Sequence, residues 1–203
     1  WIADEVMSGF GRTGKWFAYQ HSTAEPDLIV FAKGVNSGYV PLGGVIISDE
    51  IAATFNDRVF PGGLTYSGHP LATAAAVATL DVMADEKIVE NAAAMGENVI
   101  KPLIQELMAK HKVIGEVRGK GVFWALDLVT DRATRAPLAP YGASSPAMNE
   151  LVAACKKLGL FPFNNYNRMH ICPPCNITEA ELREGFAILD QAFASIAHHY
   201  TGA

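Results

Sequence analysis

Residues 26–34, Pro-Asp-Leu-Ile-Val-Phe-Ala-Lys-Gly, contain the stretch of sequence that decides the fold. Its centre, Leu28 to Ala32, is a continuous apolar run, which is typical of strands buried on both faces of an α/β sheet. Lys33 closes this run. Because an ammonium group is costly to bury, a lysine at this place is either paired or used chemically, or it emerges into solvent as the strand ends.

Two further strands are predicted on either side of this run, at Ile2 to Val6 and at Gly44 to Ile47. The Gly-, Asn- and Ser-containing stretch from Gly34 to Gly43 is predicted to be a loop. A helix is predicted to begin near His69, with proline at its first position, and to continue to about Met83.

The pattern changes in the second half of the chain. An amphipathic helical segment from Ile88 to Leu107 contains Pro102, which is expected to kink or split it. A strand is predicted from Gly121 to Leu128, a helix from 147 to 158, a short strand from 168 to 172 and a last helix opened by the capping box of Thr178 and Glu181. We therefore expect residues 1–113 to belong to a large α/β domain and residues 114–203 to form a small C-terminal α+β domain.

Composition narrows the class of protein. The chain has 203 residues, of which 50% are hydrophobic and 18% charged, and a net charge of −5. A chain of this sign has no general attraction to nucleic acid or anionic lipid, and no apolar run is long enough to span a bilayer. The three cysteines argue against a disulfide scaffold and indicate a cytoplasmic protein. Because the chain opens with Trp1 at the end of a predicted buried strand, we expect further sequence upstream.

Three short motifs are expected to be accidental. Residues Gly9 to Gly14 satisfy the dinucleotide-binding pattern, but no helical pattern follows. The same stretch with Lys15 satisfies the P-loop pattern except at Trp16, where a serine or threonine is needed to hold magnesium. The Cys172-Pro-Pro-Cys175 pair opens no helix and has no second ligand pair, so we expect no redox or metal site there.

An acid and an amine are predicted to meet at one edge of the sheet. Asp4 and Lys33 both follow strands, and the carboxyl ends of parallel strands meet at the edge where ligands bind. This pair suits pyridoxal 5′-phosphate (PLP). The lysine can form an imine with the cofactor, and the acid can keep the pyridine nitrogen protonated, which makes the ring an electron sink.

The arrangement of these stretches resembles the class III aminotransferases, which are PLP enzymes of fold type I. The resemblance covers the whole chain in order and approximate spacing. It rests on the following segments: Asp4–Val6 with Gly9–Gly14, Pro26–Gly34 running into Gly38–Gly44, Thr65–Ala72, Val117–Gly121 and Pro173–Pro174.

The resemblance implies a role for four residues. Lys33 would be the Schiff-base lysine and the base that moves a proton between substrate and cofactor. Asp4 would pair with the pyridinium nitrogen, and Val6 would pack on one face of the ring. Thr65 would bind the cofactor phosphate of the neighbouring subunit, which implies a homodimer with shared active sites. Family members also carry a long N-terminal region, so this chain alone is expected to lack a complete site.

The substrate is less sharply indicated. Many relatives have an arginine three residues before the Pro-Pro pair to bind a carboxylate, and this sequence has His170 there. Arg168 is expected on the same strand face and is either a displaced anion clamp or a surface arginine. The resemblance therefore leads us to expect an ω-amino acid, a sulfonate such as taurine or a simple amine as the donor, and pyruvate or 2-oxoglutarate as the acceptor. A class III aminomutase, a decarboxylase or an inactive truncated fragment are the alternatives.

Overall fold

A computed structural model describes all residues, 1–203, and divides the chain into two compact units, Trp1–Asn91 and Ala92–Ala203. The division falls earlier in the chain than the predicted domain boundary at residue 113. The physical reason is that Val99, Ile100 and Ile104 pack into the hydrophobic core of the second unit. The boundary between a large and a small domain at residue 113 stays a prediction.

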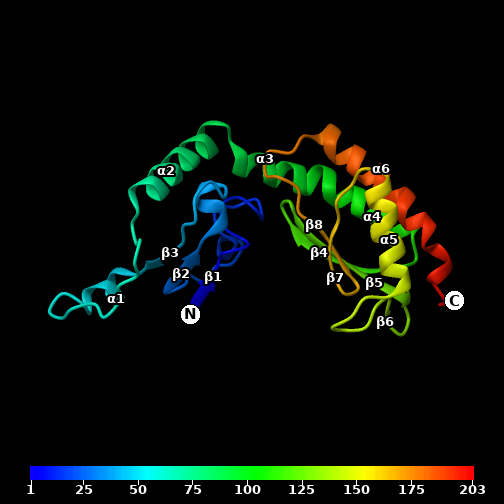
Figure 1. The fold of residues 1–203 in the computed structure, drawn as a ribbon, viewed down its shortest axis with the longest axis horizontal. Helices are drawn as coiled ribbons and strands as arrows, with labels where there is room; N and C mark the ends of the chain where they lie inside the picture. The colour runs from blue at the N-terminus through cyan, green and yellow to red at the C-terminus, as the bar shows by residue number, and fades with distance from the viewer. The chain divides into compact units, whose positions relative to one another are not determined.

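The first unit contains a three-stranded sheet in the order β1-β2-β3 (Figure 1). Strand β1 (Ile2–Asp4) runs parallel to β2 (Leu28–Phe31), and β3 (Gly44–Ile47) runs antiparallel to β2. The three strands lie where the sequence predicts them. The Gly44 to Ile47 run, like Leu28 to Ala32, is continuously apolar and so suits a strand buried on both faces, but this is wrong for β3, because Val45, Ile46 and Ile47 are 51%, 46% and 40% exposed.

Helices complete the first unit. They are η1 (Ala18–His21), η2 (Lys33–Asn36), α1 (Asp49–Ala53), α2 (Pro70–Asp85) and the start of α3 (Ile88–Met95). Helix α2 begins as predicted, with proline in its first turn and the His69 imidazole accepting the backbone N–H of Leu71 at 3.2 Å. A small core of Phe10, Val35 and side chains from α2 and α3 holds the unit together.

The kink or split expected at Pro102 takes the form of a π-helical turn just before it, because the segment is helical without a break from Ile88 to Lys110. After α3 come a π-helical turn, η3 (Gly96–Ile100), and α4 (Lys101–Lys110), with Pro102 in the first turn of α4. Proline has no backbone N–H, so the regular hydrogen-bonding pattern is interrupted there. Gly96 lies so close to the backbone of Gly121 that a Cβ atom at this position would overlap it.

The second unit is an antiparallel sheet covered by helices. The strands β4 (Ile114–Lys120), β5 (Phe123–Asp131), β8 (Arg168–Ile171) and β7 (Phe163–Asn165) lie in that order, and the short β6 (Ala136–Pro137) pairs with β5. Helices α4, α5 (Pro146–Lys157) and α6 (Glu179–Ser195) pack on this sheet, and η4 (Ala197–His199) follows α6 (Figure 1).

This architecture confirms the α+β prediction for the second half. Alternate residues of β5, Trp124, Leu126 and Leu128, are buried, and the Thr178–Glu181 capping box forms at the start of α6. The strands β4, β6 and β7 were not expected from the sequence. No helix in residues 1–203 has both the length and the apolar character needed to cross a membrane.

Candidate active site

Lys33 lies where β2 leaves the sheet. It is the first residue of η2, and its backbone has φ of 42°, a left-handed conformation that is rare for a residue with a side chain. The following Gly34 packs so closely on Phe10 that an added Cβ would lie 2.8 Å from the Phe10 Cβ. Backbone strain of this kind costs about 1–3 kcal/mol and is concentrated at functional sites.

Asp4 ends β1, the strand next to β2. Because the two strands are parallel, with Asp4 opposite Val30, their carboxyl ends share one edge of the sheet. The Asp4 carboxylate accepts the backbone N–H of Val6 at 3.1 Å, which orients the acid at the strand end. The structure therefore places Asp4 and Lys33 at the sheet edge predicted for them.

The Lys33 side chain reaches back over the segment that follows Asp4. Its Nζ lies 2.7 Å from Sδ of Met7, and both side chains are exposed. Val6, between Asp4 and Met7, is half-buried. The structure thus brings the lysine against the segment from residue 4 to residue 7, and the sequence analysis had assigned no role to Met7 because nothing in a sequence marks such a contact.

Glu5 is a second residue that the sequence analysis missed. Its side chain is buried, and its carboxylate accepts the Ser8 hydroxyl at 2.5 Å and the backbone N–H groups of Ala18 at 2.9 Å and Tyr19 at 2.8 Å. An acid directly after a strand is the only sequence signal for this role. The two backbone hydrogen bonds tie the segment after Asp4 to η1, and the bond from Ser8 closes that segment on itself.

The glycine-rich stretch from Gly9 to Gly14 is a turn. Gly11 and Gly14 have φ of 89° and 83°, the N–H of Gly14 bonds to Gly11 O at 2.9 Å, and no helix begins at Gly14. The dinucleotide-binding motif and the P-loop both need a helix to begin there. These glycines form a structural turn, and no helix follows them.

Thr65 lies in an exposed turn between α1 and α2, where the N–H of Ser67 bonds to Leu64 O at 3.0 Å. Neighbouring apolar side chains are also exposed, among them Val59 (89%), Leu64 (80%) and Tyr66 (82%). No contact in this chain brings Thr65 to Asp4 or Lys33.

Arg168 and His170 lie on the same face of β8, as predicted, while Met169 between them faces the core. Arg168 Nε is 4.0 Å from Oδ1 of Asp127, whose Oδ2 accepts Arg118 Nη2 at 2.5 Å. Asp127 thus pairs closely with Arg118 and lies at the outer limit of ion-pair distance from Arg168.

His170 is biased towards its neutral form. Burial lowers the pKa of the imidazole, the positive charge of Arg168 lowers it further, and the carboxylate of Asp127 opposes both effects. The ring also packs against Phe163, with 5.1 Å between the ring centres. A neutral imidazole can orient a polar group, but it does not replace the fixed charge of an arginine.

Residues 1–193 match the family described as aminotransferase class-III, so the chain belongs to the class III aminotransferase family. The taurine–pyruvate aminotransferase of Bilophila wadsworthia is 37% identical over 98% of this chain and 45% of its own length. The 5-aminovalerate aminotransferase DavT of Pseudomonas aeruginosa is 40% identical over 97% of this chain and 44% of its own length.

A solved structure agrees with these relatives. The taurine:2-oxoglutarate aminotransferase of Bifidobacterium kashiwanohense, in complex with PLP and glutamate, matches 98% of this chain and 45% of its own with a TM-score of 0.93 and 42% identity. The fold is therefore that of the PLP enzymes of fold type I, as predicted. The chain spans about 45% of the length of the relatives it matches.

Proposed function

We propose that this chain supplies the cofactor-holding lysine and the ring-pairing acid of a PLP-dependent aminotransferase. The observation that carries the proposal is the placement of Lys33 and Asp4 beyond the carboxyl ends of adjacent parallel strands. The residues fit the cofactor chemically, because an exposed amine can bond to its aldehyde and a carboxylate can pair with its protonated ring nitrogen.

Each residue has a defined task in this proposal. When bound, PLP supplies an electron sink for the substrate carbon that loses a proton. Lys33 holds the cofactor and, once displaced by substrate, moves that proton with its amine. Asp4 keeps the ring nitrogen protonated, and its bond to the Val6 N–H fixes the direction of the carboxylate. The proton-transfer step contributes typically about 10²–10⁴-fold to the rate.

Borohydride reduction of the full-length protein followed by peptide mapping tests the proposal. We expect a pyridoxyl group on Lys33, and Lys33→Ala should abolish turnover while some PLP still binds. Lys15→Ala, at an exposed lysine of the same unit, is the matched control and should keep its activity. A pyridoxyl group on Lys15 or Lys120, or a full-length protein that binds no PLP, would sink the assignment.

We propose further that the amino donor is an ω-amino acid, an amine or a taurine-like compound and the acceptor a 2-oxo acid. The relatives support this, since their names specify taurine, 5-aminovalerate, pyruvate and 2-oxoglutarate. In this proposal Arg168 binds the acidic end of a substrate, and His170 lies beside it in its neutral form. A cytoplasmic location belongs to the proposal and rests on the cysteine content alone.

Substitution of Arg168 tests this part of the proposal. A hydrogen bond to a charged group contributes about 1.5–3 kcal/mol, so Arg168→Ala should raise the KM of the 2-oxo acid about tenfold or more. Arg183, an exposed arginine on α6 that pairs with Glu179, provides the control in Arg183→Ala. If Arg168→Ala has unchanged kinetics with every acidic substrate, Arg168 does not bind the substrate and is an ordinary surface residue.

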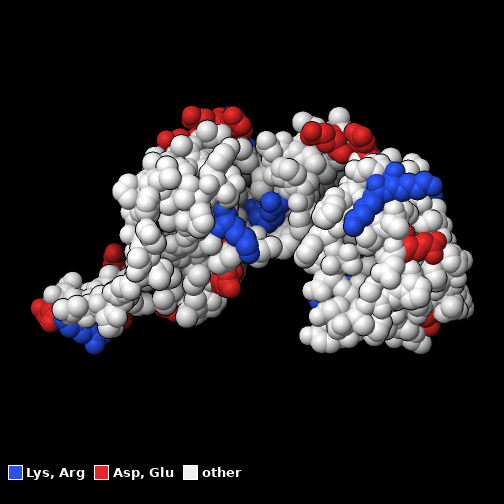
Figure 2. Space-filling model, in the orientation of Figure 1, with Lys and Arg blue, Asp and Glu red and all other residues white.

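The proposal includes a homodimer with shared sites. The segment that carries Thr65 exposes large apolar side chains, which is typical of a surface that another chain covers. Figure 2 shows charged side chains near the tip of the segment around α1 and mostly uncharged atoms along the rest of it on this face. Thr65 would then contact the phosphate of the partner's cofactor.

Subunit complementation tests the sharing. A hybrid of a Lys33→Ala subunit and a Thr65→Ala subunit has one site that lacks both residues and one that keeps both. Hybrids should therefore be more active than the mean of the two parent dimers. Hybrids that form but never exceed that mean would show that each site is built within one subunit.

A further inference from the structure

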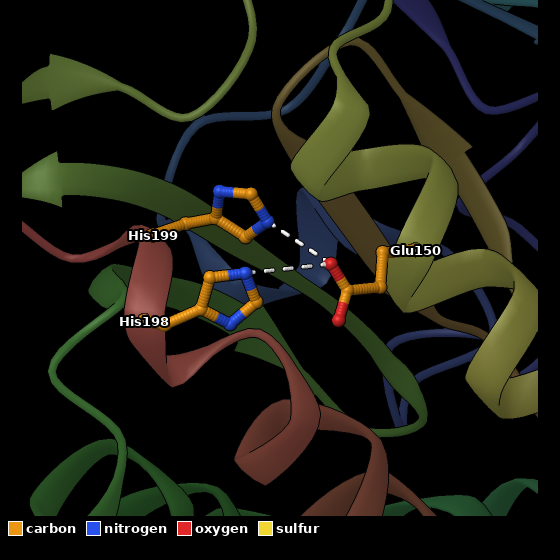
Figure 3. Close-up of side chains that lie close together, drawn as sticks. All are labelled: Glu150, His198 and His199. Atoms are coloured by element: carbon orange, nitrogen blue, oxygen red, sulfur yellow. Dashed lines mark hydrogen bonds and ion pairs between the residues drawn. The ribbon is translucent and has the colours of Figure 1, made fainter.

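The last turn of the second unit carries two adjacent histidines that face a carboxylate from another helix. His198 and His199 lie in η4, which follows helix α6. Glu150 lies in α5, and α5 packs against α6. Figure 3 shows both imidazole rings with a nitrogen directed at the Glu150 carboxylate. None of the three belongs to the candidate active site or to the family motifs described above.

The distances fit a common ligand between these groups. Glu150 Oε2 lies 3.0 Å from Nε2 of His199 and 3.7 Å from Nε2 of His198, and one potential ligand atom of each residue lies within 4.8 Å of those of the other two. Zinc binds nitrogen and oxygen at about 2.0–2.2 Å, which puts tetrahedral ligands roughly 3.4 Å apart. The printed separations of 3.0 Å and 3.7 Å lie on either side of that spacing.

The protonation pattern of His198 also favours a cation. Its Nδ1 lies 3.1 Å from the carbonyl oxygen of Ser195, which can only accept a hydrogen bond, so Nδ1 carries the hydrogen. In the neutral ring Nε2 then presents a lone pair to Glu150 Oε2, another acceptor. Metal-bound histidines are held in the same way, with the second ring nitrogen donating to a carbonyl or carboxylate.

The two rings lie close together and face the same carboxylate. Their centres are 4.0 Å apart, and Glu150 Oε2 lies within ion-pair distance of Nε2 of both. One divalent cation binds both rings in their neutral form and balances the carboxylate at the same time. The cluster is partly exposed, so a hydrated ion has access to it.

We propose that Glu150, His198 and His199 form a binding site for a divalent transition metal of the zinc class. Two imidazole nitrogens and one carboxylate oxygen are ligands that zinc uses, and a fourth position remains for water. The bound ion would join η4 to α5 across 49 residues of sequence and so stabilise the C-terminal turn of the unit.

Zinc titration of the intact, chelator-treated protein by calorimetry tests the proposal. We expect one zinc ion per chain, and an unfolding temperature that rises with zinc concentration. Three conservative variants each remove one ligand. His198→Asn keeps a donor for Ser195 O, His199→Gln keeps a donor for Glu150, and Glu150→Gln keeps the size of the side chain. Each should weaken zinc binding at least about tenfold.

The Cys172-x-x-Cys175 pair is the main competing source of zinc binding, and a double Cys172→Ser/Cys175→Ser variant controls for it. We expect this variant to bind zinc as the parent does. Cobalt substituted for zinc should show no thiolate charge-transfer band. Loss of zinc binding in the cysteine variant, no stoichiometric binding in the parent, or equal binding in His198→Asn and the parent would each overturn the proposal. Because His198 is the most exposed of the three, its variant is expected to fold in every case.

Discussion

Replacing Glu5 with Gln changes one oxygen of a buried carboxylate into an NH2 group. Glu5 is only 2% exposed. Its carboxylate accepts three hydrogen bonds, two of them from backbone N–H groups. The substitution keeps the size of the side chain and removes only its charge and one acceptor. It therefore isolates the contribution of the carboxylate to the turn that follows Asp4.

The expected loss follows from the geometry of the three bonds. If the new NH2 group takes the place of Oε1, it faces the N–H of Tyr19, and if it takes the place of Oε2, it faces the N–H of Ala18. The Ser8 hydroxyl can rotate and accept, but a backbone N–H cannot. One buried donor is thus left unpaired in either orientation, and we expect the free energy of unfolding to fall by about 1–3 kcal/mol.

Urea unfolding followed by circular dichroism measures this change, and amide hydrogen exchange at Ala18 and Tyr19 locates it. The control is Glu25→Gln, which removes the same charge from an exposed side chain of the same unit. Surface substitutions usually change stability by less than about 0.5 kcal/mol. If Glu5→Gln and Glu25→Gln unfold within that margin of each other, the reasoning about the buried carboxylate is refuted.

Two further predictions concern the second unit. Gly96→Ala should lower the free energy of unfolding by about 1–3 kcal/mol, because its Cβ would overlap the backbone of Gly121. Gly185→Ala, in α6 with open space around it, should instead raise the free energy of unfolding by about 0.4–1 kcal/mol. Chemical unfolding compares the two variants, and equal effects would contradict the close approach of Gly96 to Gly121. The pKa of Asp190 is lowered mainly by a hydrogen bond from Lys110 and, to a smaller extent, by one from His111. The ionised acid therefore stabilises the fold at pH values above its unfolded pKa of about 3.9, and this contribution is lost as the pH falls through the lower folded pKa. Asp190→Asn should be less stable than the parent at neutral pH and should approach the stability of the parent in acid.

Local sequence signals predicted much of the fold. The helix starts at Pro70 and Glu179 were marked by a proline and by the Thr178 capping box, and the buried alternation of β5 was visible in its sequence. Strand β4, Ile-Gly-Glu-Val-Arg-Gly-Lys, was missed because two glycines and three charged residues weaken its own strand preference. Its pairing with β5 provides the stability that its local sequence lacks.

Some features of the candidate site also followed from the sequence, and others did not. The meeting of Asp4 and Lys33 followed from the rule that parallel strands end at one edge, and the structure agrees with it. The burial of Glu5 and the contact of Met7 with Lys33 depend on tertiary packing that leaves no local pattern. The same holds for Glu150 and its two histidine neighbours, which come from distant parts of the sequence.

The open side of β3 has a practical consequence for anyone who produces residues 1–203 alone. The strand pairs with β2 on one side only, and Val45, Ile46 and Ile47 are 51%, 46% and 40% exposed. A flat apolar strand with unpaired backbone groups is a template for association with other copies. We therefore expect this segment by itself to aggregate as its concentration rises, and a lysine at position 46 to improve its solubility by placing a charge on that edge.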